Sequence, residues 1–495
     1  MKKTICCLLA AILLVSPFSV GVAAAPASSS SRLEQTILNA WERMATTVDI
    51  EDFNISVYDI DSIYNAIVGR HPEYFYVSPI VRYSYYEFNS RVIELEFRYC
   101  FKKGELSARQ AELDTAVNAA AAYAGQAPTQ IGKILLLHEY ITNLCGYDKK
   151  LYTEGYSDEL SSTAYGCLVD GMAICQGYAL AFQLVAQQLG IQAEFVFSLD
   201  MQHAWNIVLV NGTYYHVDCT SDDLLLYSGF EGENKFDLTN IFGSAHDYFL
   251  KTDAEMYALG FYGWESPYAA NGRSISGFWE DAVNMIYYYD GSYYYLREGD
   301  NSSGELMQMD AGQISGAQSI YQFETVPWSF GKDANPNDLY LYDGYWQGAD
   351  TNITFFENEL YFNTANQIYR LNLDALEAVP VYNLPDETAA FAAIGVKDGY
   401  LCFNKVFLNQ NGFTVFYTYE RTYVQPGKSN FPNLMGDANG DGKVTVSDVM
   451  AVRQYVAAFN VTIFKDLADV SKDGKFTAAD VMLLRLYNAD LISSF

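Results

Sequence analysis

The stretch HAWNIVLVNGTYYHVDCT, residues 203–220, constrains the fold of this chain more than any other segment. Its dipeptide Asn211-Gly212 is a strong signal for a two-residue β-hairpin turn. With the turn at this point, Val210 pairs with Thr213, and the register of both strands is set. The sequence therefore predicts a hairpin whose facing side chains can be named in advance.

The predicted register places His203 and Asp218 on one face, because side chains alternate between the faces of a strand. As diagonal neighbours they lie about 7–8 Å apart, within reach of each other. The carboxylate can then hold one tautomer of the imidazole and stabilise its charged form. His216 faces the same way but lies about 13 Å along the ladder at about 3.3 Å per residue. Cys219 faces the opposite side, so His203 and Asp218 are the expected acid–base pair.

A nucleophile for this pair lies upstream, in YGCLVDGMAICQGYALAFQLV. Cys175 stands where a glycine-containing loop enters an apolar helix expected over 175–190. The positive end of a helix dipole and a nearby imidazolium favour the thiolate, which is the attacking species. Backbone N–H groups at the same helix start can hold a developing oxyanion. A lone cysteine before a helix is more often inert, but the order Cys, His, Asp on a helix start and two paired strands favours catalysis.

The motifs CQGYA, HAWN and HVDCT resemble the core of the bacterial transglutaminase-like superfamily, which is related in fold to papain-type thiol enzymes. The resemblance implies an α+β core over 126–255, without a cofactor. It also implies that Cys175 is the nucleophile, His203 a general base and then acid, and Asp218 the orienting partner. The expected substrate is a protein or peptide amide. Water as acceptor gives a peptidase or amidase and an amine gives a cross-linking transferase; abundant extracellular water favours hydrolysis.

Two segments near the C-terminus share one pattern, DANGDGKVTVSD and DVSKDGKFTAAD. Each offers oxygen ligands at loop positions 1, 3, 5 and 12, a backbone carbonyl at position 7, and glycine at position 6 for the sharp turn of a calcium loop. A V-M-x-x-R helix follows each loop, and the duplication argues against a chance acidic turn. The expected ligands are Asp437, Asn439, Asp441, Lys443 and Asp448, then Asp469, Ser471, Asp473, Lys475 and Asp480.

The duplicated loop and helix resemble a type I dockerin over about residues 435–492. The resemblance implies a small all-α module over 433–495 that binds two Ca²⁺ ions. Its partner would be a cohesin module on a scaffold protein of a secreted, cellulosome-like polysaccharide-degrading complex. Partner choice in that family depends mainly on loop positions 10 and 11. These are Val446 and Ser447 in the first loop but Ala478 and Ala479 in the second, which argues against a symmetric dual binding mode.

Residues 1–24 have the pattern of a secretory signal peptide. Lys2 and Lys3 precede an apolar run and small residues near 22–24. A membrane anchor is the alternative, but the run is short for a span and contains Pro17. No later segment reads as a membrane span, so we expect a secreted protein that is extracellular or held in a cell-surface complex.

The composition supports the same localisation. Sixty acidic residues against 30 Lys and Arg give a net charge of −30, which argues against a nucleic-acid partner because such proteins carry basic patches. Six of the eight cysteines lie beyond residue 24. They are too sparse for a disulfide framework in a secreted chain.

The remaining regions are separated by their hydrophobic periodicity. Residues 33–125 mix helical and strand patterns and form an expected N-terminal α/β region. Residues 260–425 contain tyrosine-rich hairpins, in MIYYYDGSYYYL, ITFFENELYFN and GVKDGYLCF. They predict an all-β region of ten or more strands with propeller-like blades, although about 165 residues is too few for an ordinary closed propeller. The expected fold class is multidomain: a transglutaminase-like, papain-like α+β core, this β region and the dockerin.

Two classes of function remain open from the sequence. The first is a secreted thiol enzyme docked to a cohesin scaffold. The alternative is a catalytically silent, dockerin-borne binding protein that uses the tyrosine-rich β region. Glycan chemistry lacks support, because no carboxylate pair stands in a recognisable site.

Overall fold

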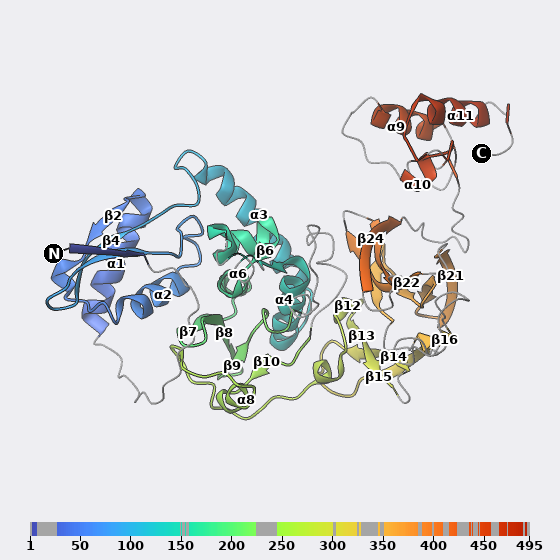
Figure 1. Ribbon diagram of the computed structural model, residues 1–495. Helices are drawn as coiled ribbons and strands as arrows, with labels where there is room; N and C mark the ends of the chain where they lie inside the picture. Colours follow the sequence, from blue (N-terminus) through green and yellow to red (C-terminus); the bar gives the residue numbers. More distant parts are fainter. Residues whose placement is uncertain are drawn as a thin grey trace. The chain divides into compact units, whose positions relative to one another are not determined.

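The computed structural model describes most of the chain in two compact units (Figure 1). One unit is Met1–Tyr294 with Met309–Ala317, and the other is Tyr295–Gln308 with Gln318–Phe495. The described residues are 2–6, 27–148, 150, 154, 158–223, 245–299, 303–323, 326–327, 345–346, 351–384, 389–397, 400–408, 415–422, 435–436, 438, 444, 446–456, 465–472, 474–488 and 491–492. None of the helices within these ranges is both long and apolar enough to cross a membrane.

The N-terminal region joins two helices to a four-stranded antiparallel sheet. The helices are α1 (Ala27–Arg43) and α2 (Ile60–Arg70), with a short 3₁₀ turn η1 (Glu51–Phe53). The sheet order is β1 (Lys2–Cys6), β3 (Arg82–Tyr86), β4 (Arg91–Glu96), β2 (Thr47–Asp49). Trp41, Tyr64 and Leu95 are among the buried apolar residues of its core. Residues 7–24 of the expected signal peptide lie outside the described residues, and the signal peptide stays a prediction.

Three helices form the body of the region that follows: α3 (Leu106–Ala124), α4 (Gln130–Leu144) and α6 (Cys175–Gln188). They pack on one another, and α6 also packs on strands β7 (Ala193–Ser198) and β8 (His203–Val210) (Figure 1). These helices lie where the spacing of apolar residues in the sequence predicts helices. Thr129 caps the start of α4 by accepting the N–H of Gly132 at 3.0 Å. The chain reverses after α6 at Gly190, where φ is +70°.

The connection from α4 to α6 consists of short elements packed close to the start of α6. They are β5 (Gly146–Tyr147), η2 (Glu159–Ser162), the π turn η3 (Gly166–Asp170) and β6 (Met172–Ala173), with β5 and β6 paired in parallel. Gly177, in the first turn of α6, lies against the backbone of Ser161 and Thr163. This close approach determines where Cys175 lies.

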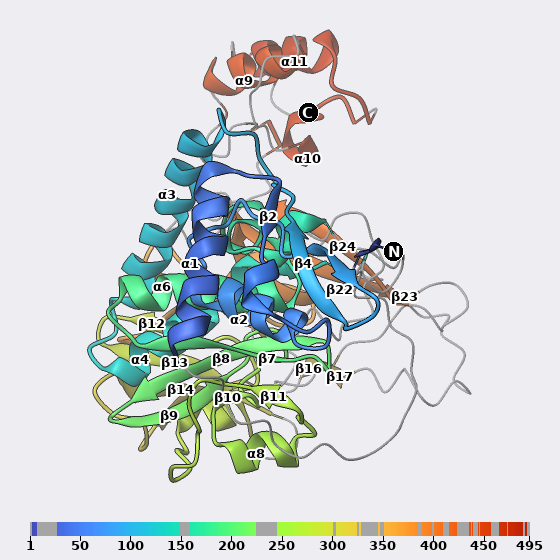
Figure 2. The same ribbon diagram turned by 90° about the vertical axis from the view of Figure 1, so that its left-hand side faces the viewer.

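The hairpin of residues 203–217 belongs to a five-stranded sheet, whose strands β7 to β11 lie in the lower part of Figure 2. Its order is β10 (Phe249–Lys251), β9 (Thr213–Val217), β8, β7, β11 (Trp264–Glu265). Val210 pairs with Thr213, which confirms the predicted register. Asn211 and Gly212 have φ of +50° and +83°, the left-handed values that a two-residue hairpin turn of this type requires.

The two faces of this sheet are covered by different elements. On one face Asn206 donates from Nδ2 to the carbonyl of Ala179 in α6 at 3.0 Å. On the other face Trp205 packs with Met256 of α8 (Asp253–Ala258) and with Phe261 in one buried cluster. Strand β8 thus contacts α6, which carries Cys175, on one face and the aromatic cluster that packs against His203 on the other.

The tyrosine-rich region consists of antiparallel sheets whose neighbours are consecutive in sequence. The sheets are β12–β15, β16–β17, β18–β21 and β22–β24, and none closes into a barrel among the described residues. Two of the predicted turns are present, at Asp290-Gly291 and Glu357-Asn358, where every φ is positive. The third, at residues 398–399, lies outside the described residues. The propeller-like arrangement stays a prediction. The 3₁₀ turn η5 (Phe278–Asp281) precedes these sheets. In chain order their strands are β12 (Tyr287–Tyr289), β13 (Ser292–Glu298), β14 (Gly304–Asp310), β15 (Gln318–Phe323), β16 (Val326–Pro327), β17 (Tyr345–Trp346), β18 (Ile353–Phe356), β19 (Glu359–Asn363), β20 (Gln367–Asn372), β21 (Glu377–Asn383), β22 (Ala389–Lys397), β23 (Tyr400–Leu408) and β24 (Val415–Thr422).

The described C-terminal residues form α9 (Val446–Val456), α10 (Lys465–Ala468) and α11 (Ala478–Asn488). α9 packs against α11. Val452 and Leu484, which occupy equivalent positions in the two repeats, are both fully buried between them. The sequence duplication therefore reappears as a shared core, and the all-α class of the module stays a prediction.

We expect Gly177→Ala to destabilise the protein by about 1–3 kcal/mol through overpacking. An added Cβ would lie 2.5 Å from the carbonyl oxygen of Ser161 and 2.8 Å from Cβ of Ala173. Gly104→Ala is the matched control, since nothing lies within 4 Å of its added Cβ. Urea denaturation checks the difference in the free energy of unfolding. Equal stabilities of the two variants would contradict the tight packing around the start of α6.

Candidate active site

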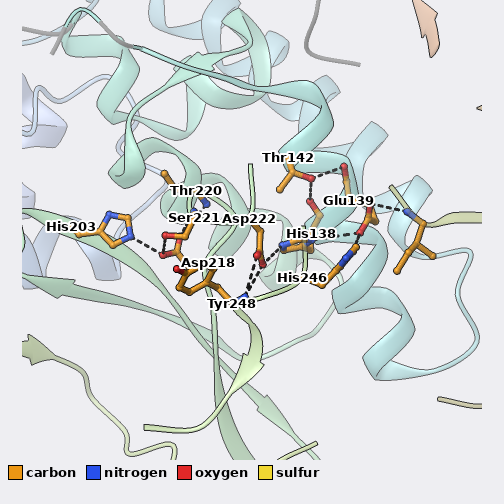
Figure 3. Close-up of polar contacts among 11 residues, drawn as sticks. His138, Glu139, Thr142, His203, Asp218, Thr220, Ser221, Asp222, His246 and Tyr248 are labelled. Carbon is orange, nitrogen blue, oxygen red and sulfur yellow. Dashed lines mark hydrogen bonds and ion pairs between the residues drawn. The ribbon is translucent and has the colours of Figure 1, made fainter. Parts of the chain in front are cut away.

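His203 and Asp218 contact each other directly, as the hairpin register predicts. His203 is the first residue of β8, and Asp218 follows the last residue of β9. Nε2 of the imidazole lies 2.7 Å from Oδ2 of the carboxylate (Figure 3). The Asp218 side chain is 1% exposed and that of His203 is 16% exposed. The pair therefore has a buried acidic end and an imidazole that reaches the surface of the site.

The carboxylate of Asp218 is held by the loop that follows it. Its Oδ1 accepts the backbone N–H groups of Thr220 and Ser221 at 3.0 and 3.1 Å, and its Oδ2 accepts the Ser221 hydroxyl at 2.7 Å. Burial alone raises the pKa of Asp218, but His203 and Ser221 outweigh it and hold the pKa below its ordinary value. Sequence reasoning missed Ser221, although a serine two or three residues after an aspartate is a recognisable turn signal.

The imidazole of His203 is arranged to carry a proton. Burial lowers the pKa of His203, but the charge of Asp218, the hydrogen bond that the ring donates to Asp218 and the influence of Cys175 outweigh it and raise the pKa well above its ordinary value. The ring stacks on Trp205, with centroids 5.5 Å apart and planes at 24°. Phe261 meets it edge-on at 5.7 Å. These contacts fix the orientation of the ring as well as its charge.

Cys175 completes the group from the other side of the imidazole. It is the first residue of α6, its thiol is free, and it is 7% exposed. Nε2 of His203 binds Asp218, so Nδ1 is the ring atom that remains for a thiol, and Cys175 is among the groups that raise the pKa of His203. The first N–H groups of a helix have no partner within it, so the start of α6 can bind an oxyanion. The three residues selected from the sequence are thus brought together.

His216 has a different arrangement from His203. Its Nδ1 accepts the indole N–H of Trp205 at 2.9 Å, so its proton is on Nε2, which donates to Asp253 at 2.8 Å. Burial is the main cause of a lowered pKa of His216, which favours this neutral form. His216 therefore anchors Trp205, on which His203 stacks. Asp253 lies far along the chain, and no sequence pattern indicated it.

The other described cysteines differ from Cys175 in their surroundings. Cys100, Cys145, Cys167 and Cys219 also carry free thiols. Burial raises the pKa of Cys219 well above its ordinary value and that of Cys100 to about 12. These two thiols are poor nucleophiles at neutral pH, since the thiolate is the reactive form. The side chain of Cys402 lies outside the described residues.

The second C-terminal loop brings together oxygen atoms that suit a hard cation. Asp480 accepts the N–H of Ser471 at 3.0 Å, and Asp469 accepts the N–H of Gly474 at 2.8 Å. The loop turns at Gly474, where φ is +73°. Asp480 is fully buried. Carboxylate and hydroxyl oxygens at these loop positions match the preference of calcium, so the donor set fits that ion.

The corresponding ligands of the first loop are described only in part. Asp448 is fully buried in the first turn of α9. Lys475, expected to contribute its backbone carbonyl in the second loop, lies within the described residues. Asp437, Asn439, Asp441 and Lys443 of the first loop, and Asp473 of the second, lie outside them. Their roles as ligands stay predictions.

Two parts of the chain match known protein families. Residues 118–219 match the transglutaminase-like superfamily, and residues 435–487 match the dockerin type I domain. The chain therefore carries a transglutaminase-like domain, to which Cys175, His203 and Asp218 belong, and a C-terminal type I dockerin domain. Dockerin domains of this type are typically calcium-binding and bind cohesin modules.

Solved structures similar to this chain share little of its sequence. A crystal structure of a TGase is 16% identical to this chain, with a TM-score of 0.21. The match covers 29% of this chain and 43% of the TGase chain. A protein from Cytophaga hutchinsonii described as a candidate cysteine protease is 14% identical to this chain, with a TM-score of 0.19. The match covers 28% of this chain and 56% of that protein. A GH43 endo-arabinanase from Bacillus licheniformis is 16% identical to this chain, with a TM-score of 0.18. The match covers 33% of this chain and 61% of the arabinanase. This chain thus spans less than two thirds of each of them.

No curated protein matches the chain.

We expect Asp218→Asn to lower the pKa of His203 by about one unit or more, because the charge of Asp218 is the largest cause that raises it. Titration of the imidazole by NMR measures the shift, and one unit corresponds to about 1.4 kcal/mol. His71 is an internal control, since its own pKa is raised by Glu73 and Glu34. A His203 pKa that stays in place in the variant would contradict the charge pairing.

Proposed function

We propose that the transglutaminase-like domain is a thiol enzyme that acts on peptide or side-chain amides through Cys175, His203 and Asp218. The observation that carries the proposal is the contact of His203 with the buried carboxylate of Asp218 at 2.7 Å; Cys175 at the start of α6 is among the groups that raise the pKa of the same imidazole. A structural histidine needs no such thiol partner, as His216 illustrates. The family match over residues 118–219 supports the same assignment.

The proposed reaction uses the ion pair of Cys175 and His203. The thiolate attacks the amide carbonyl carbon, and the N–H groups at the start of α6 stabilise the oxyanion. His203 gives its proton to the leaving nitrogen as the C–N bond breaks, which leaves a thioester on Cys175. The acceptor then loses a proton to His203 and displaces the thiolate. Asp218 keeps the ring in one orientation and stabilises its charged form throughout.

We propose water as the acceptor, so that the overall reaction is hydrolysis. Extracellular water is abundant, and no sequence motif of the chain reads as an amine-binding site. Incubation of a glutamine-containing peptide with a labelled primary amine tests the choice. Release of ammonia or of a peptide fragment without incorporation of the amine supports hydrolysis. Incorporation of the amine assigns the transferase instead.

We expect iodoacetamide to label Cys175 faster than every other cysteine of the calcium-loaded protein, because it is the thiol paired with an imidazolium. His203→Ala removes that pairing and should slow the labelling by at least about tenfold. Mass spectrometry of tryptic peptides gives the rate for each cysteine. Cys100 is the matched control within the same molecule, and its slow rate should not respond to the substitution.

Uniform slow labelling of all thiols in the folded protein would contradict the assignment of this chain as a thiol enzyme. It would favour the alternative, a catalytically silent protein that binds through the tyrosine-rich β region. Circular dichroism of the His203→Ala protein checks that the substitution leaves the fold intact.

We further propose that the protein is secreted and docked to a cohesin module of a scaffold by its dockerin domain, with two bound Ca²⁺ ions. The described helices expose apolar side chains that occupy equivalent positions in the two repeats. Met450 of α9 is 44% exposed and Met482 of α11 is 57% exposed. Val446, at loop position 10, is 66% exposed. Exposed apolar residues on a small module favour a protein partner.

We expect the wild-type chain to bind two equivalents of Ca²⁺, and Asp448→Asn and Asp480→Asn to remove one equivalent each. Both carboxylates occupy position 12 of their loops, which supplies a strong ligand. Isothermal titration with calcium measures the stoichiometry, and a panel of cohesin modules measures docking. The two variants serve as matched controls for each other. No cohesin binding with calcium present would remove the docking proposal, and cohesin binding that survives a calcium chelator would contradict its dependence on calcium.

A further inference from the structure

A second group of histidine and carboxylate side chains lies in the same unit, outside the group of Cys175. His138 and Glu139 belong to α4, and His246 precedes β10 (Figure 3). His138 and Glu139 are fully buried and His246 is 4% exposed. One ligand atom from each of the three lies within 4.8 Å of the other two. Two imidazoles and a carboxylate removed from solvent need a physical reason.

The ring atoms of His138 indicate where a ligand would bind. Its Nε2 binds Oδ2 of Asp222 at 3.0 Å. Its Nδ1 is buried and has no hydrogen-bond partner among the described residues; it faces Oε1 of Glu139 at 3.6 Å, beyond hydrogen-bond distance. Nε2 of His246 binds the same Oε1. Three donor atoms thus converge, and one of them is unsatisfied.

The surroundings of the cluster hold each donor in orientation. Asp222 accepts the N–H of Tyr248 at 3.1 Å and orients His138. The second oxygen of Glu139 accepts the N–H of Ile286 at 3.1 Å. A carboxylate on the far nitrogen of a histidine is the usual outer partner of a metal-bound imidazole, because it fixes the tautomer and raises the basicity of the ligand. The cluster has this partner already in place.

We propose that His138 through Nδ1, Glu139 through Oε1 and His246 through Nε2 bind one divalent transition-metal ion, with Zn²⁺ as the preferred ion. Two imidazole nitrogens and one carboxylate oxygen form a ligand set that zinc commonly adopts, with a fourth position for water. The 3.6 Å between Nδ1 and Oε1 is close to the spacing of two ligands about 2.0–2.2 Å from a tetrahedral ion. The direct contact between His246 and Glu139 would have to lengthen to admit the ion between them.

The role of the ion is structural. None of its ligands is exposed enough to meet a substrate, so the ion supports the fold even though its three protein ligands leave a fourth position for water. The ion ties α4 to the segment before β10. Through Asp222, whose N–H binds the carbonyl of Asp218 at 3.2 Å, it also supports the loop that holds Asp218. The site is independent of the thiol chemistry and remains if Cys175 is inert.

Zinc binding to the untagged, full-length Cys175→Ala protein tests the proposal. This background removes the thiol that could bind zinc beside His203, and saturating calcium fills the dockerin loops. We expect one equivalent of Zn²⁺ after dialysis, and Co²⁺ in its place to show visible d–d absorption without a thiolate charge-transfer band. Glu139→Gln and His246→Gln should lose the equivalent. Asp222→Asn should weaken affinity about 10–100-fold, because it removes only the outer partner.

His71→Gln is the matched control, since His71 also lies between two carboxylates, each at 2.9 Å, but is 21% exposed. It should keep the full zinc equivalent. No zinc bound beyond background, a thiolate band with Co²⁺, or loss of zinc in His71→Gln would each overturn the proposal. If the ligand variants fail to fold, the stoichiometry and the cobalt spectrum of the Cys175→Ala protein decide the question alone.

Discussion

The pairing of β8 with β9 is the constraint on which the candidate active site depends. The turn at Asn211-Gly212 sets the register, and the register places His203 beside Asp218. A shift by one residue would move one of them to the opposite face, since side chains alternate along a strand. The same strand carries Asn206, which binds α6, and Trp205, which supports the imidazole. One strand therefore positions His203 relative to both Asp218 and the helix that carries Cys175.

Asp218 and Asp222 lie in one loop and serve two different histidines. Asp218 binds the partly exposed His203, whereas Asp222 binds the buried His138 (Figure 3). Both carboxylates are almost fully buried, so each needs its partner to offset desolvation. A loop with two buried charges cannot move without breaking one of these contacts. The rigidity of the group of Cys175 therefore depends on the cluster behind it as well as on the sheet.

The dockerin domain follows a different principle, in which one short unit is used twice. Each repeat has an acidic segment followed by a helix, and apolar residues of both repeats form one buried cluster. Val452 and Leu484 fill the space between α9 and α11 from equivalent positions. The exposed Met450 and Met482 are equivalent in the same way. Duplication thus supplies both the buried and the exposed surfaces of the module, although Val446 and Ala478 distinguish its two halves.

The sequence by itself determined the features that depend on local rules. It was enough to predict the hairpin register, the tyrosine-rich hairpins, the main helices and the contact of His203 with Asp218, because turn residues and hydrophobic periodicity act over short distances. Only the tertiary structure decided which distant residues complete these groups. Asp253 beside His216 and His246 beside Glu139 meet their partners from remote segments. The burial of each contact then decides whether its two side chains are charged or neutral. The spacing of residues in the sequence does not show which side chains lose contact with water.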